Sequence, residues 1–303
     1  MKQAIVTGST GLLGMALVKH LSSVGIRVLC LGRKSLNPTD IKQSFGDNST
    51  YLKLPMKNIL SLEKKLEEVG WTSLENCIFY HFAWGGSKAL TDGSFNEQLN
   101  NAVYAANAVK VARKIGCSKF VNVGTLEETY AEQYLQKKNH LYNFSQSNYT
   151  VSKLASRNLC KMVAYLEKID YVHTRISIPL IPDLSKGSYL ASTLKKIFNG
   201  ESYEKPTNRQ LFDIILTDDT SKAYHLIGKH GVNKADYFIG TTRPDTLGGY
   251  FERFESYMKG MVEEKITLDR QTKLIFDSSK LNLDTGFTSS SDLKDIIKNL
   301  RES

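Results

Sequence analysis

Thr7-Gly8-Ser9-Thr10-Gly11-Leu12-Leu13-Gly14 is the stretch that decides the fold. It follows an apolar run at residues 3–6 that predicts a strand, and it opens a helical pattern over residues 12–24. Gly8 permits a tight turn with positive φ, Gly11 lets a phosphate group approach the backbone, and Gly14 lets the helix pack close to the sheet. Because a helix N-terminus favours an anion, the whole stretch predicts a pyrophosphate site of a dinucleotide. The alternative is a glycine-rich turn without a ligand.

The first 176 residues alternate short apolar runs with longer helical patterns, which is typical of a parallel sheet wrapped by helices. The predicted strands cover residues 3–6, 27–31, 51–54, 77–82, 119–123 and 171–176. The predicted helices cover residues 12–24, 62–69, 95–115 and 149–166. We therefore expect an α/β fold with a Rossmann-type doubly wound parallel sheet, whose ligands bind beyond the carboxyl ends of the strands.

The pattern becomes less regular after residue 176. Helices are predicted at residues 190–198, 219–228 and 247–259, and strands at residues 210–216 and 236–239. We expect a dinucleotide-binding domain over residues 1–176, to which residues 209–240 return. A smaller C-terminal substrate-binding lobe then consists mainly of residues 177–303.

Composition narrows the class of partner. Hydrophobic residues make up 41% and charged residues 23% of the chain, which favours a packed core over disorder. The net charge of +9 suits anionic ligands such as phosphate-bearing small molecules. Because Lys and Arg are spread along the chain rather than gathered in a stripe, we expect no nucleic-acid partner.

Neither a metal site nor a membrane segment is expected. The four cysteines contain no Cys-x-x-Cys pair, and the six histidines show no pair at ligand spacing. No apolar run approaches the roughly 20 residues that a bilayer span needs. The chain runs from Met1 directly into a predicted strand without a signal-peptide pattern. These features lead us to expect a cytoplasmic protein with reduced thiols and no membrane contact.

The glycines follow the spacing Gly-x-x-Gly-x-x-Gly. Together with the segments described below, this spacing resembles the extended short-chain dehydrogenase/reductase family, which includes nucleotide-sugar epimerases, dehydratases and ketoreductases. The resemblance covers most of residues 1–240. It implies a nucleotide-sugar substrate and a homodimer formed through the predicted helices at residues 95–115 and 149–166.

Tyr149 and Lys153 lie four residues apart and therefore share one helix face. They resemble the Tyr-x-x-x-Lys motif of this family, which implies that Tyr149 donates a proton to a carbonyl oxygen during reduction. Lys153 would lower the pKa of Tyr149 and hold the nicotinamide ribose. Thr125 follows the fifth predicted strand and aligns with the family's hydroxyl residue that hydrogen-bonds the reacting oxygen. The alternative is an ordinary surface pair of Tyr149 and Lys153 at a helix start.

The second predicted strand ends at Leu31-Gly32-Arg33-Lys34, where NAD-selective sites carry an acidic residue. Two cations stand there instead, and an arginine can pair with a ribose 2′-phosphate. NADP(H) is therefore favoured and NAD(H) is the alternative, unless both cations are merely exposed loop residues.

The resemblance implies contacts elsewhere. Further cofactor contacts fall on Met56, Phe82, Ala83, Trp84, Asn101 and Ile176. Substrate contacts fall on Trp84, Thr125, Glu127 and Arg209, of which Arg209 could equally form a structural ion pair.

Three reactions share the family scaffold: 4-epimerisation, 4,6-dehydration and simple ketone reduction or alcohol oxidation. Dehydratases carry Thr-Asp-Glu after the fifth strand, whereas this chain has Thr125-Leu126-Glu127. Leucine cannot transfer a proton, so dehydration is disfavoured unless Glu128 substitutes. A basic Arg33 site suits dissociable NADPH, and the leading expectation is NADPH-dependent reduction of a nucleotide-linked 4-keto-6-deoxy sugar. The alternatives are a nucleotide-sugar epimerase with tightly held NAD and a catalytically silent dinucleotide-binding regulatory protein.

Overall fold

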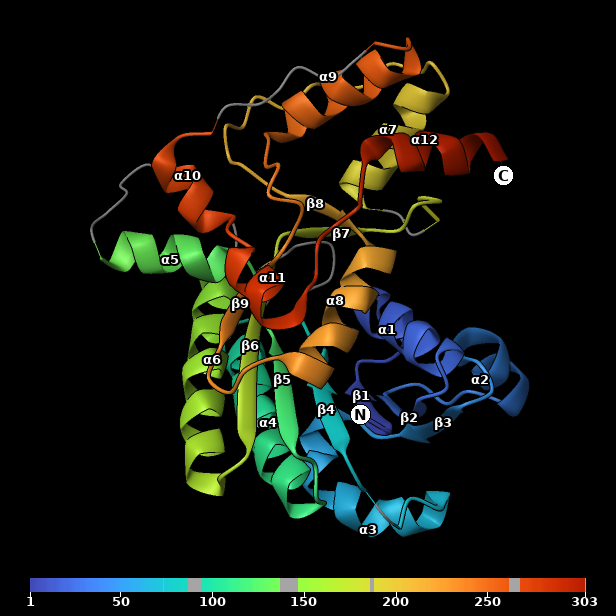
Figure 1. The fold of residues 1–303 in the computed structure, drawn as a ribbon, viewed down its shortest axis with the longest axis vertical. Helices are drawn as coiled ribbons and strands as arrows, with labels where there is room; N and C mark the ends of the chain where they lie inside the picture. The colour runs from blue at the N-terminus through green and yellow to red at the C-terminus, as the bar shows by residue number, and fades with distance from the viewer. Residues whose placement is uncertain (73, 87–93, 137–146, 186–187, 262–267, 303) are drawn as a thin grey trace.

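The computed structural model describes residues 1–72, 74–86, 94–136, 147–185, 188–261 and 268–302 (Figure 1). Its central sheet has the strand order β3-β2-β1-β4-β5-β6-β9, and all neighbouring strands are parallel. The strands are β1 (Gln3–Thr7), β2 (Arg27–Gly32), β3 (Ser49–Lys53), β4 (Cys77–His81), β5 (Lys119–Val123), β6 (Asp170–Ile176) and β9 (Asp236–Ile239). The order reverses between β1 and β4, which opens a crevice at the carboxyl ends of these two strands. The predicted Rossmann-type sheet is confirmed.

Helices cover both faces of this sheet. One layer consists of α1 (Leu12–Ser23), α2 (Pro38–Phe45), α8 (Thr217–His230) and α11 (Ser279–Thr285). The other consists of η1 (Met56–Ser61), α3 (Leu62–Leu66), η2 (Glu67–Val69), α4 (Phe95–Lys114) and α6 (Ser147–Glu167). The side chains of β1 alternate between the two faces of the sheet: Ala4 and Val6 pack in the core under the first layer, and Ile5 packs in the core under the second. Burial on both faces is the usual state of a parallel sheet.

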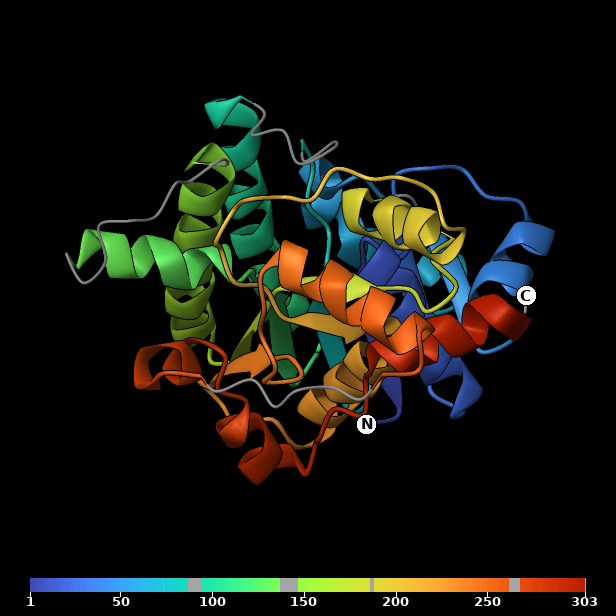
Figure 2. The same ribbon diagram turned by 90° about the horizontal axis from the view of Figure 1, so that it is seen from above.

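A smaller lobe lies above the carboxyl ends of the strands, at the top of Figure 1. It contains the parallel pair β7 (Ile178–Leu180) and β8 (Ile214–Leu216), with α7 (Tyr189–Phe198), α9 (Leu247–Met258) and α12 (Leu293–Glu302). These elements share an apolar core of their own. Figure 2 looks down on this lobe and shows α5 (Glu127–Leu135) projecting to one side.

The C-terminal segment is fastened to the start of α8 by one carboxylate. Buried Asp219 accepts hydrogen bonds from the backbone N–H groups of Ser290 (2.6 Å) and Ser291 (2.7 Å). The hydroxyls of Ser289 (2.7 Å) and Ser291 (2.9 Å) also donate to it. Burial opposes ionisation of Asp219, but these donors outweigh it and hold its pKa below the ordinary value.

The predicted strands and helices of the first half are confirmed, with ends shifted by a few residues at most. The prediction for residues 210–216 was too long, because only β8 forms there and Phe212 instead makes an isolated antiparallel bridge to Asp245. The patterns did not predict α2, α5, β7, α10 (Arg270–Ile275), α11 or α12. Most of these elements are short, so they contain too few turns or alternations for a periodic signal.

Candidate active site

The glycine stretch forms a tight cradle between β1 and α1. Gly8 has φ +67°, and a Cβ there would lie 2.8 Å from the backbone nitrogen of Ala83. A Cβ on Gly14 would lie 2.4 Å from the carbonyl oxygen of Gly8. Gly11 is the N-cap residue of α1, and no side chain of the described residues caps this helix. The cradle therefore fits a pyrophosphate group, which would meet the uncapped first turn of α1.

A groove with a volume of 590 Å³ runs from this cradle across the β1–β4 crevice. Its walls include most of the predicted cofactor contacts: Gly8, Thr10, Gly11, Arg33, Lys34, Met56, Phe82, Ala83, Trp84 and Asn101. It also contains Lys57, Glu97, Asn100 and Tyr104, which the sequence did not single out. The groove is large enough for much of a dinucleotide.

Other predicted cofactor contacts lie outside this groove. The buried Ser9 hydroxyl donates to the carbonyl of Leu31 (3.1 Å), so it fastens the glycine loop to β2. Leu12 lines a separate cavity between α1 and α8, and Leu13 packs against the core of that layer. Ile176 is buried at the end of β6.

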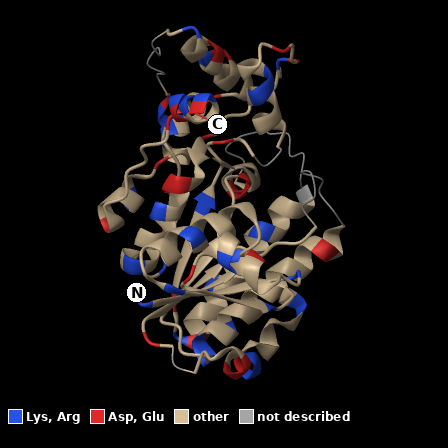
Figure 3. Ribbon diagram, turned by 90° about the vertical axis from the view of Figure 1, so that its right-hand side faces the viewer, with Lys and Arg blue, Asp and Glu red and all other residues tan. Residues whose placement is uncertain are grey.

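Three cations line the groove beyond β2 and β3. Arg33 and Lys34 are exposed, and Lys57 follows from η1. The hydroxyl of Tyr51 donates to the carbonyl of Lys34 (2.7 Å), which holds this loop against β3. Figure 3 shows other Lys and Arg residues spread over both parts of the molecule. The cations in the groove thus mark the end that suits an additional phosphate.

Tyr149 and Lys153 come together with Thr125 where β5 ends and α6 begins. Lys153 is buried, its Nζ donates to the carbonyl of Val123 (2.9 Å), and it lies 5.7 Å from the centre of the Tyr149 ring. The Tyr149 side chain is hydrogen-bonded to Thr125. Trp84 connects this group to the groove, because its indole lines the groove and lies 3.9 Å from Lys153 Nζ. The structure thus brings the three predicted catalytic residues into one cluster.

The ionisation of Tyr149 differs from the sequence-based expectation. Burial, together with the negative charges of Glu128 and Glu127, raises the pKa of Tyr149, and the hydrogen bond with Thr125 lowers it only partly. Burial also lowers the pKa of Lys153 to about 8, although the charge of Glu128 raises it. The expected lowering of the Tyr149 pKa was therefore wrong, because desolvation of the phenolate dominates in this fold. A protonated Tyr149 at neutral pH suits donation of a proton to a carbonyl oxygen.

The helix α4 supports Trp84 and the loop that follows it. Gln98 is buried and its Oε1 accepts a hydrogen bond from Trp84 Nε1 (2.7 Å). Asn101 holds Gly85 from both sides, accepting from its N–H (2.8 Å) and donating to its carbonyl (3.0 Å). The sequence did not single out Gln98, although its three-residue spacing from Asn101 places both on one helix face.

Of the predicted substrate contacts Glu127 and Arg209, Glu127 lies beside the catalytic cluster, whereas Arg209 is exposed. Glu127 is half-buried beside Thr125, and its Oε1 accepts from Gln210 Nε2 (3.0 Å). Burial raises the pKa of Glu127, while the bond from Gln210 lowers it. Arg209 itself is exposed in the segment before β8. The contact from the smaller lobe to this site therefore comes from the neighbouring residue, Gln210.

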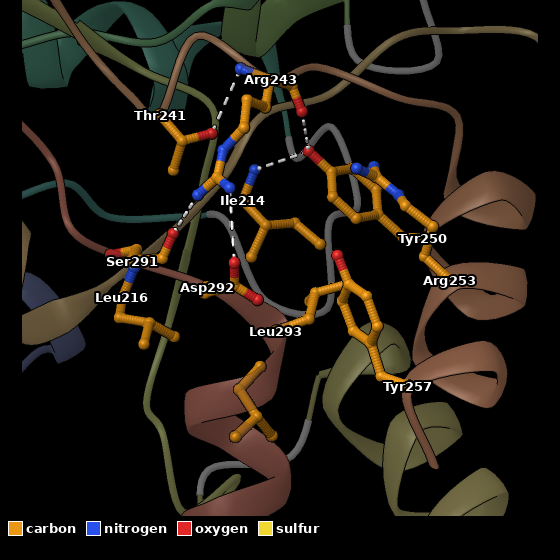
Figure 4. Close-up of a pocket in the computed structure, with 11 residues that line it drawn as sticks. Ile214, Leu216, Thr241, Arg243, Tyr250, Arg253, Tyr257, Ser291, Asp292 and Leu293 are labelled. Carbon is orange, nitrogen blue, oxygen red and sulfur yellow. Dashed lines mark hydrogen bonds and ion pairs between the residues drawn. The ribbon is translucent and has the colours of Figure 1, made fainter. Parts of the chain in front are cut away.

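Another cavity, in the smaller lobe, is too small for a substrate. Figure 4 shows the Arg243 guanidinium between Asp292 (3.4 Å) and the carbonyl of Ser291, while its own carbonyl accepts from Tyr250 (2.9 Å). The space enclosed there is 30 Å³, enough for about one or two waters.

The described residues contain neither a helix able to cross a membrane nor a group of three or more His, Cys, Asp or Glu placed to hold a metal ion.

Residues 4–240 match the model of the NAD dependent epimerase/dehydratase family. A search of curated protein sequences finds no match. The fold is similar to that of UDP-glucose 4-epimerase from Thermotoga maritima, with 18% identity, 99% of both chains covered and a TM-score of 0.73. It is also similar to UDP-glucuronic acid 4-epimerase from Bacillus cereus, solved with UDP-4-deoxy-4-fluoro-glucuronic acid and NAD (16% identity, 99% of this chain and 98% of that chain, TM-score 0.73). UDP-N-acetylglucosamine 4-epimerase from Methanobrevibacter ruminantium gives 18% identity, the same coverage and a TM-score of 0.72. At these identities the structures establish the shared fold.

Proposed function

Because the chain belongs to the NAD dependent epimerase/dehydratase family, and so is an enzyme of the extended short-chain dehydrogenase/reductase type, we propose that it is a nucleotide-sugar 4-epimerase. The sequence alone favours a net reductase of a 4-keto sugar. The similar structures reported above are 4-epimerases, one of them solved with NAD, so the alternative reaction becomes the leading proposal.

The observation that carries the proposal is the cluster of Tyr149, Lys153 and Thr125 beside Trp84. Trp84 lines the groove and also contacts both Lys153 and Tyr149, so the cluster adjoins the groove. A phenol, an ammonium and a hydroxyl in this arrangement suit the interconversion of a sugar hydroxyl and a ketone.

Each residue then has a role. A nicotinamide, when bound, supplies reversible hydride transfer. The deprotonated form of Tyr149 takes the proton from the sugar 4-hydroxyl as this is oxidised, becomes a neutral phenol, and returns the proton when the ketone is reduced. The Thr125 hydroxyl holds the reacting oxygen, and the Lys153 ammonium stabilises the Tyr149 phenolate that exists before the oxidation and again after the reduction. Inversion requires the ketone to present its opposite face before reduction.

A second candidate function rests on the cations of the groove. Arg33, Lys34 and Lys57 line it where a 2′-phosphate would lie, which favours NADP(H). A dissociable NADPH suits a net reduction of a nucleotide-linked 4-keto-6-deoxy sugar, so this reductase is the alternative that a specific observation supports.

Cofactor content of the purified protein separates these functions. Released nucleotide is identified by chromatography, and the protein is then incubated with UDP-sugars and with 4-keto-6-deoxy nucleotide sugars. We expect stoichiometric NAD and interconversion of 4-epimers without added cofactor. A requirement for added NADPH that is consumed with the substrate would favour the reductase. Bound dinucleotide without turnover of any sugar would favour the silent regulatory protein.

We also propose the substrate contacts and the assembly. Trp84, Thr125 and Glu127 contact the sugar, Arg209 contacts the diphosphate, and residues 177–303 supply most of the substrate-binding lobe. A stripe of exposed apolar residues on α6, consisting of Val151, Leu159, Met162 and Leu166, supports a homodimer. These residues recur within one face of the helix, as a helix-packing surface requires.

A further inference from the structure

A buried carboxylate lies behind the catalytic cluster. Glu128 in the first turn of α5 has no exposed surface. Its Oε1 accepts a hydrogen bond from the backbone N–H of Thr125 (2.9 Å). Its Oε2 lies 2.9 Å from Nε2 of His173 on β6 and 3.9 Å from Nη1 of Arg157 on α6. A buried carboxylate with this many partners is held in one position.

Both ring nitrogens of His173 lie within hydrogen-bond distance of polar groups. Its Nδ1 lies 3.4 Å from the amide nitrogen of Asn122, which can only donate. The other ring nitrogen, Nε2, faces the Glu128 carboxylate and donates a hydrogen bond to it. Burial opposes ionisation of Glu128, but His173, the Thr125 N–H and Lys153 together hold its pKa below the ordinary value. Glu128 is thus an anion hydrogen-bonded to His173.

Gly124 leaves the room for this pair. A Cβ at position 124 would lie 2.3 Å from Glu128 Oε1 and 2.4 Å from His173 Nε2. Because real side chains never approach so closely, only glycine allows the carboxylate and the imidazole to meet directly beneath Thr125.

Lys153 needs a counter-charge that its direct contacts do not provide. Its buried ammonium donates to the carbonyl of Val123 and lies over the Trp84 ring, and both partners are uncharged. The negative charge that acts on it most strongly is that of Glu128. A buried cation without a compensating anion loses its proton.

We propose that Glu128 is a positioning residue of the active site: its carboxylate fixes Thr125 beside Tyr149 and supplies the counter-charge of the Lys153 ammonium. This inference rests on the proposed function, because it assigns Glu128 to the same three catalytic residues. Glu128 acts through Thr125 and Lys153.

Other charged or titratable groups also face this cluster. They come from β4, α5, α6, β6 and β9 and comprise His81, Glu127, Glu132, Tyr149, Arg157, Cys160, Tyr171, His173 and Asp236. Lys153 lies against Trp84, and its pKa is about 8. A titration from pH 7 to 9.5 therefore covers the loss of its proton.

Trp84 fluorescence reports the charge of Lys153 without any substrate. An ammonium 3.9 Å from the indole centre alters its emission, so emission should change as Lys153 loses its proton. The other tryptophan, Trp71, lies under the guanidinium of Arg27, a type of group that does not lose its proton in proteins. We expect the full-length protein, with its nucleotide content measured beforehand, to show a step near pH 8 that Lys153→Met abolishes.

Glu128→Gln keeps an acceptor for Thr125 but removes the charge. Removal of a negative charge lowers the pKa of neighbouring groups, so the step should move to lower pH by about one unit. Glu132→Gln on the same helix is the matched control and should leave the midpoint where it is. An unchanged midpoint in Glu128→Gln, or a step that survives Lys153→Met, would overturn the electrostatic role. This titration needs no turnover, so its outcome is independent of whether the epimerase proposal is right.

Glu128→Asp tests the hydrogen bond to Thr125 and serves if Glu128→Gln does not fold. Aspartate keeps the negative charge, but its side chain is shorter by one methylene group, so its carboxylate lies farther from the Thr125 N–H. We expect the emission midpoint to stay near that of the parent protein, while kcat falls about tenfold or more and KM changes little. An unchanged kcat, or a midpoint that moves as in Glu128→Gln, would overturn the proposed division of roles.

Discussion

The ring of Tyr149 stands edge-on to the indole of Trp84, with ring centroids 5.9 Å apart and an interplanar angle of 83°. This contact belongs to the ring and does not depend on the phenol hydroxyl. The two functions of Tyr149, packing and proton transfer, can therefore be separated by one substitution.

Tyr149→Phe keeps the ring contact and removes the transferable proton. We expect kcat to fall by about 10²–10⁴-fold while the affinity for the dinucleotide changes little. Steady-state kinetics with the responsive UDP-sugar and a binding titration with NADH measure the two effects. Retained turnover in this variant would remove Tyr149 from the mechanism.

Arg33→Ala tests the cofactor preference. The guanidinium lines the groove, so its loss should weaken NADPH binding about tenfold or more and NADH binding much less. Fluorescence titration with both nucleotides gives the ratio. Lys42→Ala, on α2 and outside the groove, removes a similar charge and is the control. Equal losses for NADPH and NADH in Arg33→Ala would eliminate the 2′-phosphate argument.

Gly8→Ala distinguishes steric contact from backbone conformation. Gly8 and Gly25 both have positive φ, +67° and +79°, but only at Gly8 would the new methyl group meet backbone atoms. Gly25→Ala should cost about 1–2 kcal/mol in the free energy of unfolding, and Gly8→Ala clearly more. Gly8→Ala should also abolish tight dinucleotide binding, whereas Gly25→Ala keeps it. Urea unfolding and nucleotide titration of both variants test this, and similar costs at both positions would argue against a close-packed loop.

Asp213→Asn tests a buried acid in the smaller lobe. The Asp213 carboxylate accepts from the N–H of Thr242 (2.8 Å) and from the Thr241 hydroxyl, yet burial raises the pKa of Asp213 to about 6. The folded chain therefore binds this proton more tightly than the unfolded chain. The associated stability is present below pH 4 and is lost as the pH rises to about 6. The neutral amide should raise the free energy of unfolding by about 2 kcal/mol at pH 8 and by less at pH 5. Urea unfolding of the parent protein and the variant at pH 8 and pH 5 measures this difference. A larger increase in the free energy of unfolding at pH 5 than at pH 8 would contradict a raised pKa of Asp213.

Leu159→Glu tests the proposed homodimer. It places a charge in the apolar stripe of α6, so a dimer formed there should dissociate to a monomer. Light scattering coupled to gel filtration measures the mass. Leu60→Glu changes an exposed leucine on η1 and should leave the mass of the parent protein unchanged. A parent protein that is already monomeric would refute the assembly.

The sequence predicts the sheet and the cofactor end of the site because both depend on local patterns. The apolar runs mark every strand of the main sheet, and the glycine spacing marks the turn before α1. The pairing of Glu128 with His173 joins residues 45 positions apart and follows no periodicity. The wrong direction for the Tyr149 pKa has a similar origin, because burial depends on the packing of several segments. The sequence shows which groups are near in the chain, but desolvation depends on the whole fold.

The hydrogen bonds of Asp219 have a consequence for the order in which the two parts of the chain can fold during synthesis. Its donors, Ser289, Ser290 and Ser291, follow it by 70 to 72 residues, and α12 comes after them with Leu293, Ile296 and Ile297 in the lobe's core. While the chain grows on the ribosome, the dinucleotide-binding sheet has all its strands before these serines have been made. Asp219 must then keep water as its hydrogen-bond donor until these serines have been made. The core of the smaller lobe is consequently completed only after the sheet has all its strands.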